Sequence, residues 1–301
     1  MIEDPTPSDP RSVDLLIVSY NTSEILCDCL RSIRAHRPPD SEISLTIRVF
    51  DNASSDSTVE AVTRDFPEVL LHVSSTNVGF GRANNALAAE SRAELLLLLN
   101  SDTIWTSDIV SPLLAELDRW PNAAVAGPRL VFPDGRPQPS AQRLPSLAFE
   151  FAAAVRGTRV SRLPMLRRSR RLAGSGVHGD PEAREPRAAG FLWATCWLLK
   201  RQYVDRHGLF DQRFPLYDED LDFCRRLAAS GLCAIYVPQV VLVHIGGASS
   251  APVAKLHAMR RGRAAYYRVH DGALAAFVYK YLIGGLWRIR LADRSSTPRG
   301  G

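Results

Sequence analysis

The 301-residue sequence has no hydrophobic run long enough to cross a bilayer, and its five cysteines form no CxxC pair. The leucine run at 95–99 predicts a buried strand rather than a membrane span. The N-terminal stretch MIEDPTPSDPRSVD is acidic and proline-rich and lacks the apolar core of a secretory signal. Scattered cysteines favour reduced thiols over a disulfide framework. These absences predict a cytoplasmic chain without a transmembrane helix.

The charge balance is mildly basic, with 37 Lys and Arg residues, 32 Asp and Glu residues and a formal net charge of +5. This charge favours anionic partners, which include nucleotide phosphates, acidic lipids and nucleic acids, but it does not choose among them. The hydrophobic share of 46% is ordinary for a globular protein. The length allows a large catalytic core with an appendage.

Short apolar runs alternate with amphipathic stretches through the first 130 residues. Strands are predicted at 13–20, 45–51, 69–74, 94–100 and 123–132, with helices at 22–36, 57–66, 81–91 and 107–119 between them. A further short helix is expected at 201–207 and a strand at 233–243. Alternation of this kind, with continuously apolar strands, is typical of an α/β fold whose mostly parallel central sheet carries helices on both faces.

Changes in composition suggest three parts. Residues 1–12 are predicted to be a disordered N-terminus, 13–254 the α/β domain, and 255–301 a basic, aromatic C-terminal segment that is helical in pattern. Within the domain, 156–187 is first dense in arginine and then rich in glycine, proline and acidic residues. This composition predicts a mobile loop.

Each of the first four predicted strands ends in small polar or acidic residues: Ser19-Tyr20-Asn21, Asp51-Asn52, Ser75-Thr76-Asn77 and Asn100-Ser101-Asp102. The carboxyl ends of parallel strands meet at one edge of a sheet, where open α/β sheets bind their ligands. The sequence therefore predicts a ligand site at this edge.

Two of these segments have both a structural and a functional interpretation. Asp51 either belongs to a plain turn before a helix capped by Asp56 or accepts a hydrogen bond from a planar donor such as a pyrimidine imide. The segment Asn77–Asn85, NVGFGRANN, is either a left-handed turn or a backbone that approaches a ribose or phosphate closely. It is not a dinucleotide fingerprint, because the last glycine is missing and it follows the third strand rather than the first.

Asp102 and His244 are candidate metal ligands. Asp102 ends a buried strand, where it either helps a helix to begin or contacts a divalent cation that neutralises a diphosphate. A lone histidine at a strand end, such as His244, is more often structural than metal-bound.

The stretch PLYDEDLDFCRRLAASG (215–231) places Asp218, Glu219, Asp220 and Asp222 at a predicted helix start. The helix dipole favours acids there, and Asp222 can pair with Arg225 or Arg226. That accounts for one or two carboxylates but poorly for four. The interleaved apolar residues would raise the proton affinity of a carboxylate, which suits a general base for a sugar hydroxyl.

Six segments together resemble the family 2 glycosyltransferases, which are inverting enzymes of the GT-A (nucleotide-diphospho-sugar transferase) fold. They are IVSYN (17–21), DNASSD (51–56), NVGFGRANN (77–85), LNSD (99–102), GLFDQRFPLYDEDLD (208–222) and VHIGGAS (243–249). The branch that looks most similar contains bacterial rhamnosyltransferases that use dTDP-L-rhamnose, including enzymes that act on polyprenyl-diphosphate sugars of the cell wall. DGRPQPSAQRLPS (134–146) adds to that likeness.

The resemblance implies a role for particular residues. Asp220 would be the catalytic base, with Glu219, Asp222, Phe191 and Trp193 at the acceptor site. A divalent cation, Mg²⁺ or Mn²⁺, would be held by Asp102 directly, because Asn100 replaces the first acid of the family's metal motif, and by His244. The nucleotide-sugar would contact Ser19, Tyr20, Asn21, Asp51, Asn77, Gly79, Phe80, Gly81, Asn84, Asn100, Ser101 and Arg143.

The resulting prediction is a hexosyltransferase for cell-wall or surface polysaccharide synthesis. It would move a sugar, expected to be L-rhamnose, from a nucleoside-diphosphate donor to a hydroxyl of a glycan or polyprenyl-linked acceptor. A UDP-sugar-dependent enzyme of the same family and a non-catalytic nucleotide-sugar-binding module remain alternatives. A nucleic-acid partner is not expected, because it leaves the strand-end acids unexplained. The C-terminal segment suits either the inner surface of an anionic plasma membrane or packing on the domain.

Overall fold

The computed structural model describes residues 10–155, 183–214, 216–246 and 252–286. The predicted disordered N-terminus therefore lies almost wholly outside the described residues, as do most of the predicted mobile loop and the end of the basic segment. At the boundaries that are described, strand β1 already begins at Arg11 and strand β8 begins at Arg187, the last residue of the predicted loop.

A nine-stranded sheet forms the centre of the molecule, with strand order β3-β2-β1-β4-β10-β6-β11-β5 and β8 paired to β11. Its strands are β1 (Arg11–Ser19), β2 (Ile43–Asp51), β3 (Leu70–Val73), β4 (Leu95–Asn100), β5 (Thr103–Ile104), β6 (Ala123–Val131), β8 (Arg187–Ala189), β10 (Cys196–Lys200) and β11 (Cys233–His244). Strands β1 to β4 are mutually parallel, while β10 runs antiparallel between β4 and β6. The predicted mostly parallel α/β sheet is confirmed.

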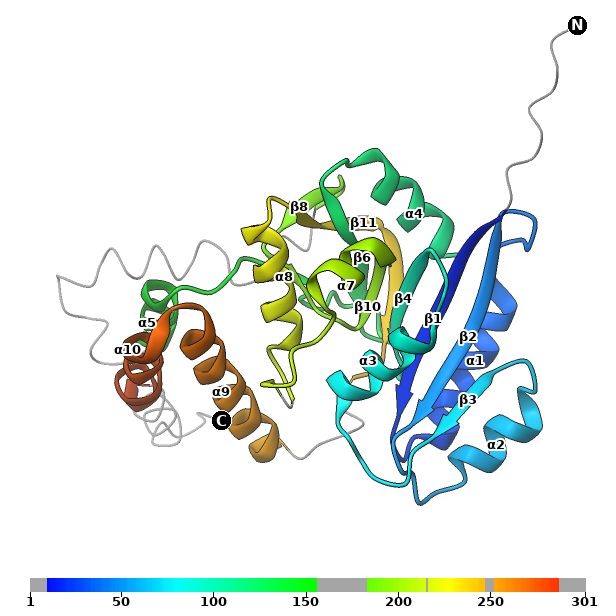
Figure 1. Ribbon diagram of the computed structural model, residues 1–301, viewed down its shortest axis with the longest axis horizontal. Coiled ribbons are helices and arrows are strands. Elements are labelled where there is room, and N and C mark those ends of the chain that lie inside the picture. Colours follow the sequence, from blue (N-terminus) through cyan, green and yellow to red (C-terminus); the bar gives the residue numbers. More distant parts are fainter. Residues whose placement is uncertain (1–9, 156–182, 215, 247–251, 287–301) are drawn as a thin grey trace, which may run out of the picture.

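Helices cover both faces of this sheet (Figure 1). One face carries α1 (Ser23–His36), α2 (Thr58–Asp65) and α4 (Val110–Arg119); the other carries α3 (Phe80–Glu90), α7 (Arg201–His207) and α8 (Glu219–Ala229). Strand side chains alternate between the faces. In the leucine run of β4, Leu95, Leu97 and Leu99 join the first core cluster, and Leu96 and Leu98 join the second.

A small two-stranded sheet of β7 (Ala141–Gln142) and β9 (Phe191–Leu192) lies beside the main one. Its strands are too short to have been expected from periodicity. The helix α5 (Leu147–Val155) follows β7. No pattern in the sequence predicted it either.

The C-terminal part consists of α9 (Pro252–His270), α10 (Gly272–Phe277) and the π-helical turn η3 (Val278–Ile283), which lie next to α5 and α8 (Figure 1). Its aromatic residues divide into two groups. Tyr266, Tyr267 and Tyr279 are buried in the core, whereas Phe277 and Tyr281 are more than half exposed, at 55% and 56%. Packing on the domain, one of the two predicted alternatives, therefore holds for the first group.

None of the five cysteines forms a disulfide, and four of them are buried. Among the described residues no helix is both long enough and apolar enough to cross a membrane.

Candidate active site

The polar strand ends do meet at one edge of the sheet. In the ladder, Ser19 of β1 pairs with Asp51 of β2, and Val18 pairs with Asn100 of β4. The backbone N–H of Asn52 donates to the Ser19 carbonyl at 2.8 Å. The predicted cluster is thus present, although Tyr20 is half exposed at 46% while Ser19 and Asp51 are buried.

One carboxylate oxygen of Asp51 has a hydrogen-bond partner, and the other has none among the described residues. Its Oδ2 accepts a hydrogen bond from the Ser54 N–H at 3.0 Å. Its Oδ1 is buried and has no partner among the described residues. A buried acceptor without a donor is costly. The spare oxygen therefore suits a ligand N–H.

Asn21 connects two strand-end loops. Its backbone N–H donates to Ser54 Oγ at 2.9 Å, and its side-chain Oδ1 accepts from the Ser55 N–H at 2.7 Å. The residue adopts a left-handed conformation with φ of 53°, which asparagine tolerates better than most residues. Asn21 therefore shapes the loop that contains Asp51.

The Asn77–Asn85 segment is fixed to the same edge. The Val78 N–H donates to Asn52 Oδ1 at 2.7 Å, and Asn77 Oδ1 accepts from the Gly79 N–H at 3.0 Å. Gly79 has φ of 85°, a conformation that L side chains rarely adopt. The segment thus turns at a positive-φ glycine, but ψ of 163° lies outside the left-handed helical region, so this is not the plain left-handed turn of the structural alternative.

Other predicted contacts in this segment serve the protein interior. A Cβ on Gly81 would approach Phe210 Cβ at 3.3 Å, so helix α3 lies close to the loop after α7. Asn84 is 1% exposed and its side-chain amide donates to the Phe80 carbonyl within the same helix. Neither observation places a ligand there.

Asn85 was not among the predicted site residues, although it ends the NVGFGRANN motif. Its side-chain amide donates to the Phe210 carbonyl at 2.7 Å and accepts from the Phe210 N–H at 3.0 Å. This pair of bonds connects the glycine-containing turn to the chain that leads into the acidic stretch.

The two predicted metal ligands come together despite their separation in sequence. His244 Nε2 lies 3.3 Å from Asp102 Oδ1. Strand β5 pairs Thr103 with His244 and so brings the end of β4 to the end of β11. Two ligands at about 2.1 Å from an octahedral Mg²⁺ are about 3 Å apart when adjacent, so the observed pair fits such an ion.

Gln138 fixes the imidazole of His244 and was missed as a site residue, although it lies in the segment DGRPQPSAQRLPS (134–146). Its Oε1 lies 2.7 Å from His244 Nδ1, and its Nε2 donates to the His244 carbonyl at 2.6 Å. The amide orientation that satisfies both bonds places the imidazole proton on Nδ1. Nε2, which faces Asp102, is then free to bind a cation.

Residues Ala194 and Thr195 connect the metal side of the site to Asp220. The Asn100 N–H donates to the Thr195 carbonyl at 2.9 Å. The Leu221 N–H donates to Asp220 Oδ1 at 2.8 Å, and the backbone of Ala194, the residue before Thr195, lowers the pKa of the Asp220 carboxyl group. The candidate base and strand β4, which ends two residues before Asp102, are thus both linked to the Ala194–Thr195 segment.

Asp220 and Glu219 carry raised pKa values. Burial is the main cause for both carboxyl groups. The Asp218 carboxylate raises the pKa of Asp220 further, while the Ala194 and Leu221 N–H groups and Arg263 oppose the rise. Glu219 Oε2 is buried and has no partner among the described residues. Carboxyl groups perturbed in this way are candidates for proton transfer.

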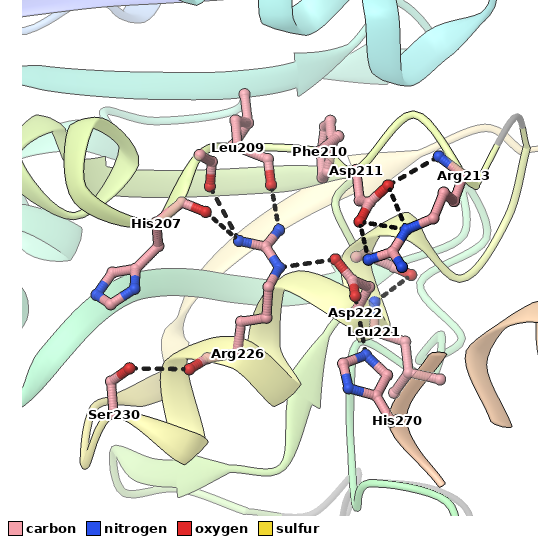
Figure 2. Close-up of polar contacts among 12 residues, drawn as sticks. His207, Leu209, Phe210, Asp211, Arg213, Leu221, Asp222, Arg226, Ser230 and His270 are labelled. Carbon is pink, nitrogen blue, oxygen red and sulfur yellow. Dashed lines mark hydrogen bonds and ion pairs between the residues drawn. The ribbon is translucent and has the colours of Figure 1, made fainter. Parts of the chain in front are cut away.

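Asp222 differs from its expected role beside the acceptor. It is 0% exposed, and its Oδ2 accepts from Arg226 Nε at 2.8 Å while Oδ1 lies 2.8 Å from His270 Nε2 (Figure 2). Arg226 was one of its two predicted partners. Both carboxylate oxygens thus have partners inside the protein, and neither is exposed to an acceptor sugar.

The remaining predicted residues lie around this site with different exposures. Phe191 is 6% exposed and belongs to the core, while Trp193 is half-buried and its N–H donates to the Ser140 carbonyl. Arg143 is exposed. A Cβ on Gly190 would come within 2.4 Å of the Leu144 nitrogen, so Gly190 packs directly on the backbone beside Arg143.

Asp102 and His244 form a pair, not a complete protein cage. Across the described ranges there is no group of three or more His, Cys, Asp or Glu side chains arranged for a metal ion. Cations that act on diphosphates commonly take only one or two protein ligands and complete their shell with substrate oxygens and water.

The chain is similar to characterised and solved proteins. It is 29% identical over 263 residues to the N-acetylglucosaminyl-diphospho-decaprenol L-rhamnosyltransferase of Mycobacterium tuberculosis, with 83% of this chain and 79% of the relative covered. Its fold is similar to that of a mannosyltransferase from Pyrobaculum calidifontis in complex with GDP-Man and Mn²⁺, with a TM-score of 0.58, 17% identity and coverage of 99% and 78%. It is also similar to GalNAc-T7 with UDP, GalNAc and Mn²⁺, with a TM-score of 0.61, 15% identity and coverage of 94% and 55%.

The predicted GT-A fold and hexosyltransferase class are confirmed by these likenesses together with a family match. The model of the family described as "Glycosyl transferase family 2" matches residues 14–208, which is more than half of the sequence. The chain therefore belongs to glycosyl transferase family 2.

Proposed function

We propose that this protein transfers L-rhamnose from a dTDP-activated donor to a hydroxyl of a lipid-linked glycan, with inversion at the anomeric carbon. Family membership supports the transferase class, and the mycobacterial relative, named as an L-rhamnosyltransferase acting on a polyprenyl-diphosphate sugar, supports the substrates. The match covers most of both chains. A role in cell-wall or surface polysaccharide synthesis follows from this assignment.

The nucleotide binds at the strand-end edge. Asp51 Oδ1, the buried acceptor without a partner, receives the imide N–H of a thymine or uracil ring. Tyr20, exposed beside it, offers an aromatic surface to the base or ribose. The turn held by Asn77 and Gly79 covers the diphosphate side. Asp51 selects a pyrimidine without distinguishing thymine from uracil, so the preference for dTDP rests on the relative.

Asp102 and His244 would hold a divalent cation, Mg²⁺ or Mn²⁺, with Gln138 fixing the imidazole. The bound cation would neutralise the charge that develops on the departing nucleoside diphosphate. The carboxylate–imidazole pair fits this role, because two protein ligands leave the other coordination positions to phosphate oxygens.

Asp220 accepts the proton of the acceptor hydroxyl. The hydroxyl oxygen forms a bond to the anomeric carbon as the bond from that carbon to the diphosphate oxygen breaks on the opposite face. A single displacement of this kind inverts the configuration. The raised pKa of Asp220 suits the task, because a more basic carboxylate takes the proton more readily.

An exposed face of α10 and η3 contacts the membrane that contains the acceptor. Leu274, Phe277, Tyr281 and Leu282 are 55–76% exposed, and Lys280 is exposed beside them. Apolar and aromatic side chains with a neighbouring cation suit the boundary of an anionic bilayer. We therefore propose peripheral attachment to the inner face of the plasma membrane.

The observation that carries the catalytic proposal is the bridge through Ala194 and Thr195. Strand β4, which leads to Asp102, is hydrogen-bonded to Thr195, and the backbone of the preceding residue, Ala194, acts on the pKa of Asp220; these observations support the proposal. In a transferase the leaving group and the base must flank the sugar that moves between them.

The proposal is tested first by measuring the change in Tm on nucleotide binding and then by an assay of sugar transfer. The protein is melted with dTDP, UDP, GDP or NAD, each with and without Mg²⁺ or Mn²⁺. A nucleotide at about 100 times its dissociation constant adds roughly 2.7 kcal/mol. We expect metal-dependent stabilisation by dTDP above UDP, followed by transfer from dTDP-L-rhamnose to a polyprenyl-diphosphate-GlcNAc acceptor.

Matched variants sharpen this test. Asp102→Asn should lose the metal-dependent part of the melting shift, while Asp220→Asn should keep the shift and lose transfer. A preference for UDP would assign a different donor within the family. Nucleotide binding without transfer from any donor would support a non-catalytic module, and no response to any nucleoside diphosphate would refute the proposal.

A further inference from the structure

The backbone just before Asp220 adopts an unusual conformation. Tyr217 and Asp218 are consecutive non-glycine residues in the left-handed region, each with φ of 66°. Side chains with a Cβ adopt it rarely, and two in succession persist only where the surroundings impose it. We call residues 217–221 the acidic turn. Something outside this turn must hold it.

Asp218 does not hold the turn by capping its own helix. It occupies the N-cap position of α8, where aspartate normally accepts from the backbone N–H groups of the first turn. Here no side-chain capping bond is made. The Asp218 carboxylate instead faces α9, the C-terminal helix.

Arg263 of α9 binds this carboxylate with both arms of its guanidinium. Nε donates to Asp218 Oδ2 at 3.0 Å, and Nη2 donates to Oδ1 at 3.2 Å. The remaining Nη1 pairs with Glu150 of α5. All three side chains are largely buried, at 20%, 12% and 11% exposed for Arg263, Asp218 and Glu150. A bidentate arginine fixes direction as well as charge.

Gly262, the residue before Arg263, packs directly on the backbone of the acidic turn. A Cβ at this position would lie 2.6 Å from the Tyr217 carbonyl oxygen and 3.2 Å from its carbon. The close neighbour is backbone and cannot rotate away. Only glycine therefore allows α9 to approach this closely.

We infer that Gly262 and Arg263 of α9 are positioning residues that hold the acidic turn, and with it Asp220, in its catalytic orientation. The inference rests on the proposed role of Asp220 as the base. Helix α9 lies outside the region matched by the family, residues 14–208. The C-terminal helix then serves the chemistry itself and not only attachment to the domain or membrane.

Gly262→Ala is the first test, with Gly285→Ala as its matched control, because a Cβ at Gly285 meets nothing within 4 Å. Alanine suits a helix better than glycine, so any loss at 262 comes from the contact with Tyr217. We expect kcat to fall about 10- to 100-fold, as displacement of a catalytic group by about 1 Å can do. The KM for the donor should stay within about 2-fold, because nucleotide contacts lie elsewhere.

Hydrogen exchange gives a readout that does not depend on turnover. The Asp222 N–H donates to the Asp218 carbonyl at 2.9 Å, and the Leu221 N–H donates to Asp220. Both amides should exchange faster in Gly262→Ala than in the wild type or in Gly285→Ala. Unchanged exchange of these two amides would show that α9 does not hold the acidic turn. Faster exchange with an unchanged kcat would show that holding the turn does not matter for catalysis.

Arg263 is tested by separating charge balance from geometry. Arg263→Met alone leaves two buried carboxylates uncompensated, so we combine it with Asp218→Asn and Glu150→Gln. Positioning predicts a triple variant with near-normal Tm but reduced kcat. A triple variant with both Tm and kcat near the wild-type values would mean that Arg263 only balances the charges of the two carboxylates. Arg268→Met, at an exposed residue of the same helix, is the control and should behave as the wild type.

These results separate the two proposals. If the wild type transfers no sugar, the proposed function fails, and hydrogen exchange still reports whether α9 holds the turn. If the wild type is active and the Gly262 variant is equally active, only the positioning inference fails.

Discussion

Replacing Asp222 by alanine should weaken the fold and leave the chemistry of the folded enzyme intact. The side chain is fully buried, ion-paired with Arg226 and bonded to His270 (Figure 2). Arg226 also donates to the carbonyls of His207, Gly208 and Leu209 at the end of α7. Asp222 therefore neutralises the cation that joins α7 to α8, and through His270 it joins α8 to α9.

The size of the effect follows from this burial. Removing one partner of a buried ion pair costs about 3–5 kcal/mol, because the other charge is left uncompensated. At about 2–4 °C per kcal/mol for a large domain, Tm should fall by roughly 6–20 °C. Asp28→Asn is the control, since the Asp28–Arg31 pair is 61% and 59% exposed and should change stability by less than about 0.5 kcal/mol.

The assay combines a melting curve with steady-state kinetics well below the lowered Tm. We expect kcat per folded molecule and the donor KM of Asp222→Ala to match the wild type within about 3-fold, because no oxygen of Asp222 faces a ligand. A large loss of kcat with an unchanged Tm would refute this reasoning and return Asp222 to the acceptor site.

Four further outcomes are expected. Asp220→Asn should abolish transfer and also raise Tm. Burial raises the pKa of Asp220, so the ionised carboxylate destabilises the folded state once the pH exceeds the ordinary carboxyl pKa of about 4. An unchanged or lower Tm would contradict this effect of burial. In the wild type, kcat/KM should fall as pH is lowered through that raised pKa, so the acid limb should lie well above pH 4, and a limb near 4 would indicate an unperturbed base. Gln138→Leu should weaken Mn²⁺ binding about 10- to 100-fold, measured by calorimetry with dTDP present, and unchanged binding would mean that Gln138 does not set the His244 tautomer. Phe277→Ser with Tyr281→Ser should reduce sedimentation with vesicles of phosphatidylglycerol without changing turnover of a soluble acceptor, and equal sedimentation would exclude this face as the membrane contact.

The strand-end edge could be predicted from sequence because its signals are local. Apolar runs mark β1, β2 and β4, and polar residues follow each of them directly. Parallel pairing then brings Ser19, Asp51 and Asn100 together without further information. Asp102 and His244 were paired through the family resemblance, and it is the two-residue strand β5 that joins them.

The contacts that reach across the chain gave no such signal. Gln138 bonds His244 across 106 residues, and Arg263 bonds Asp218 across 45. Neither residue belongs to a periodic pattern that singles it out. Gly81 shows the opposite case, since its motif suggested a ligand whereas the space it leaves is filled by Phe210. A glycine in a sequence indicates that another group lies close to the backbone, but not whether that group is a ligand or a protein side chain.

The partners of each acid explain how four carboxylates can lie within residues 218–222. Asp222 is ion-paired with Arg226 and bonded to His270, and Asp218 is ion-paired with Arg263. Only Glu219 and Asp220 lack a cation bound to them by an ion pair among the described residues, and these two have clearly raised pKa values. Among these four acids, a neighbouring arginine thus compensates the charge of Asp218 and Asp222 only. The outer acids are ion-paired and fix the backbone, and the raised proton affinity of the cluster is concentrated on the inner two, one of which is the proposed base Asp220.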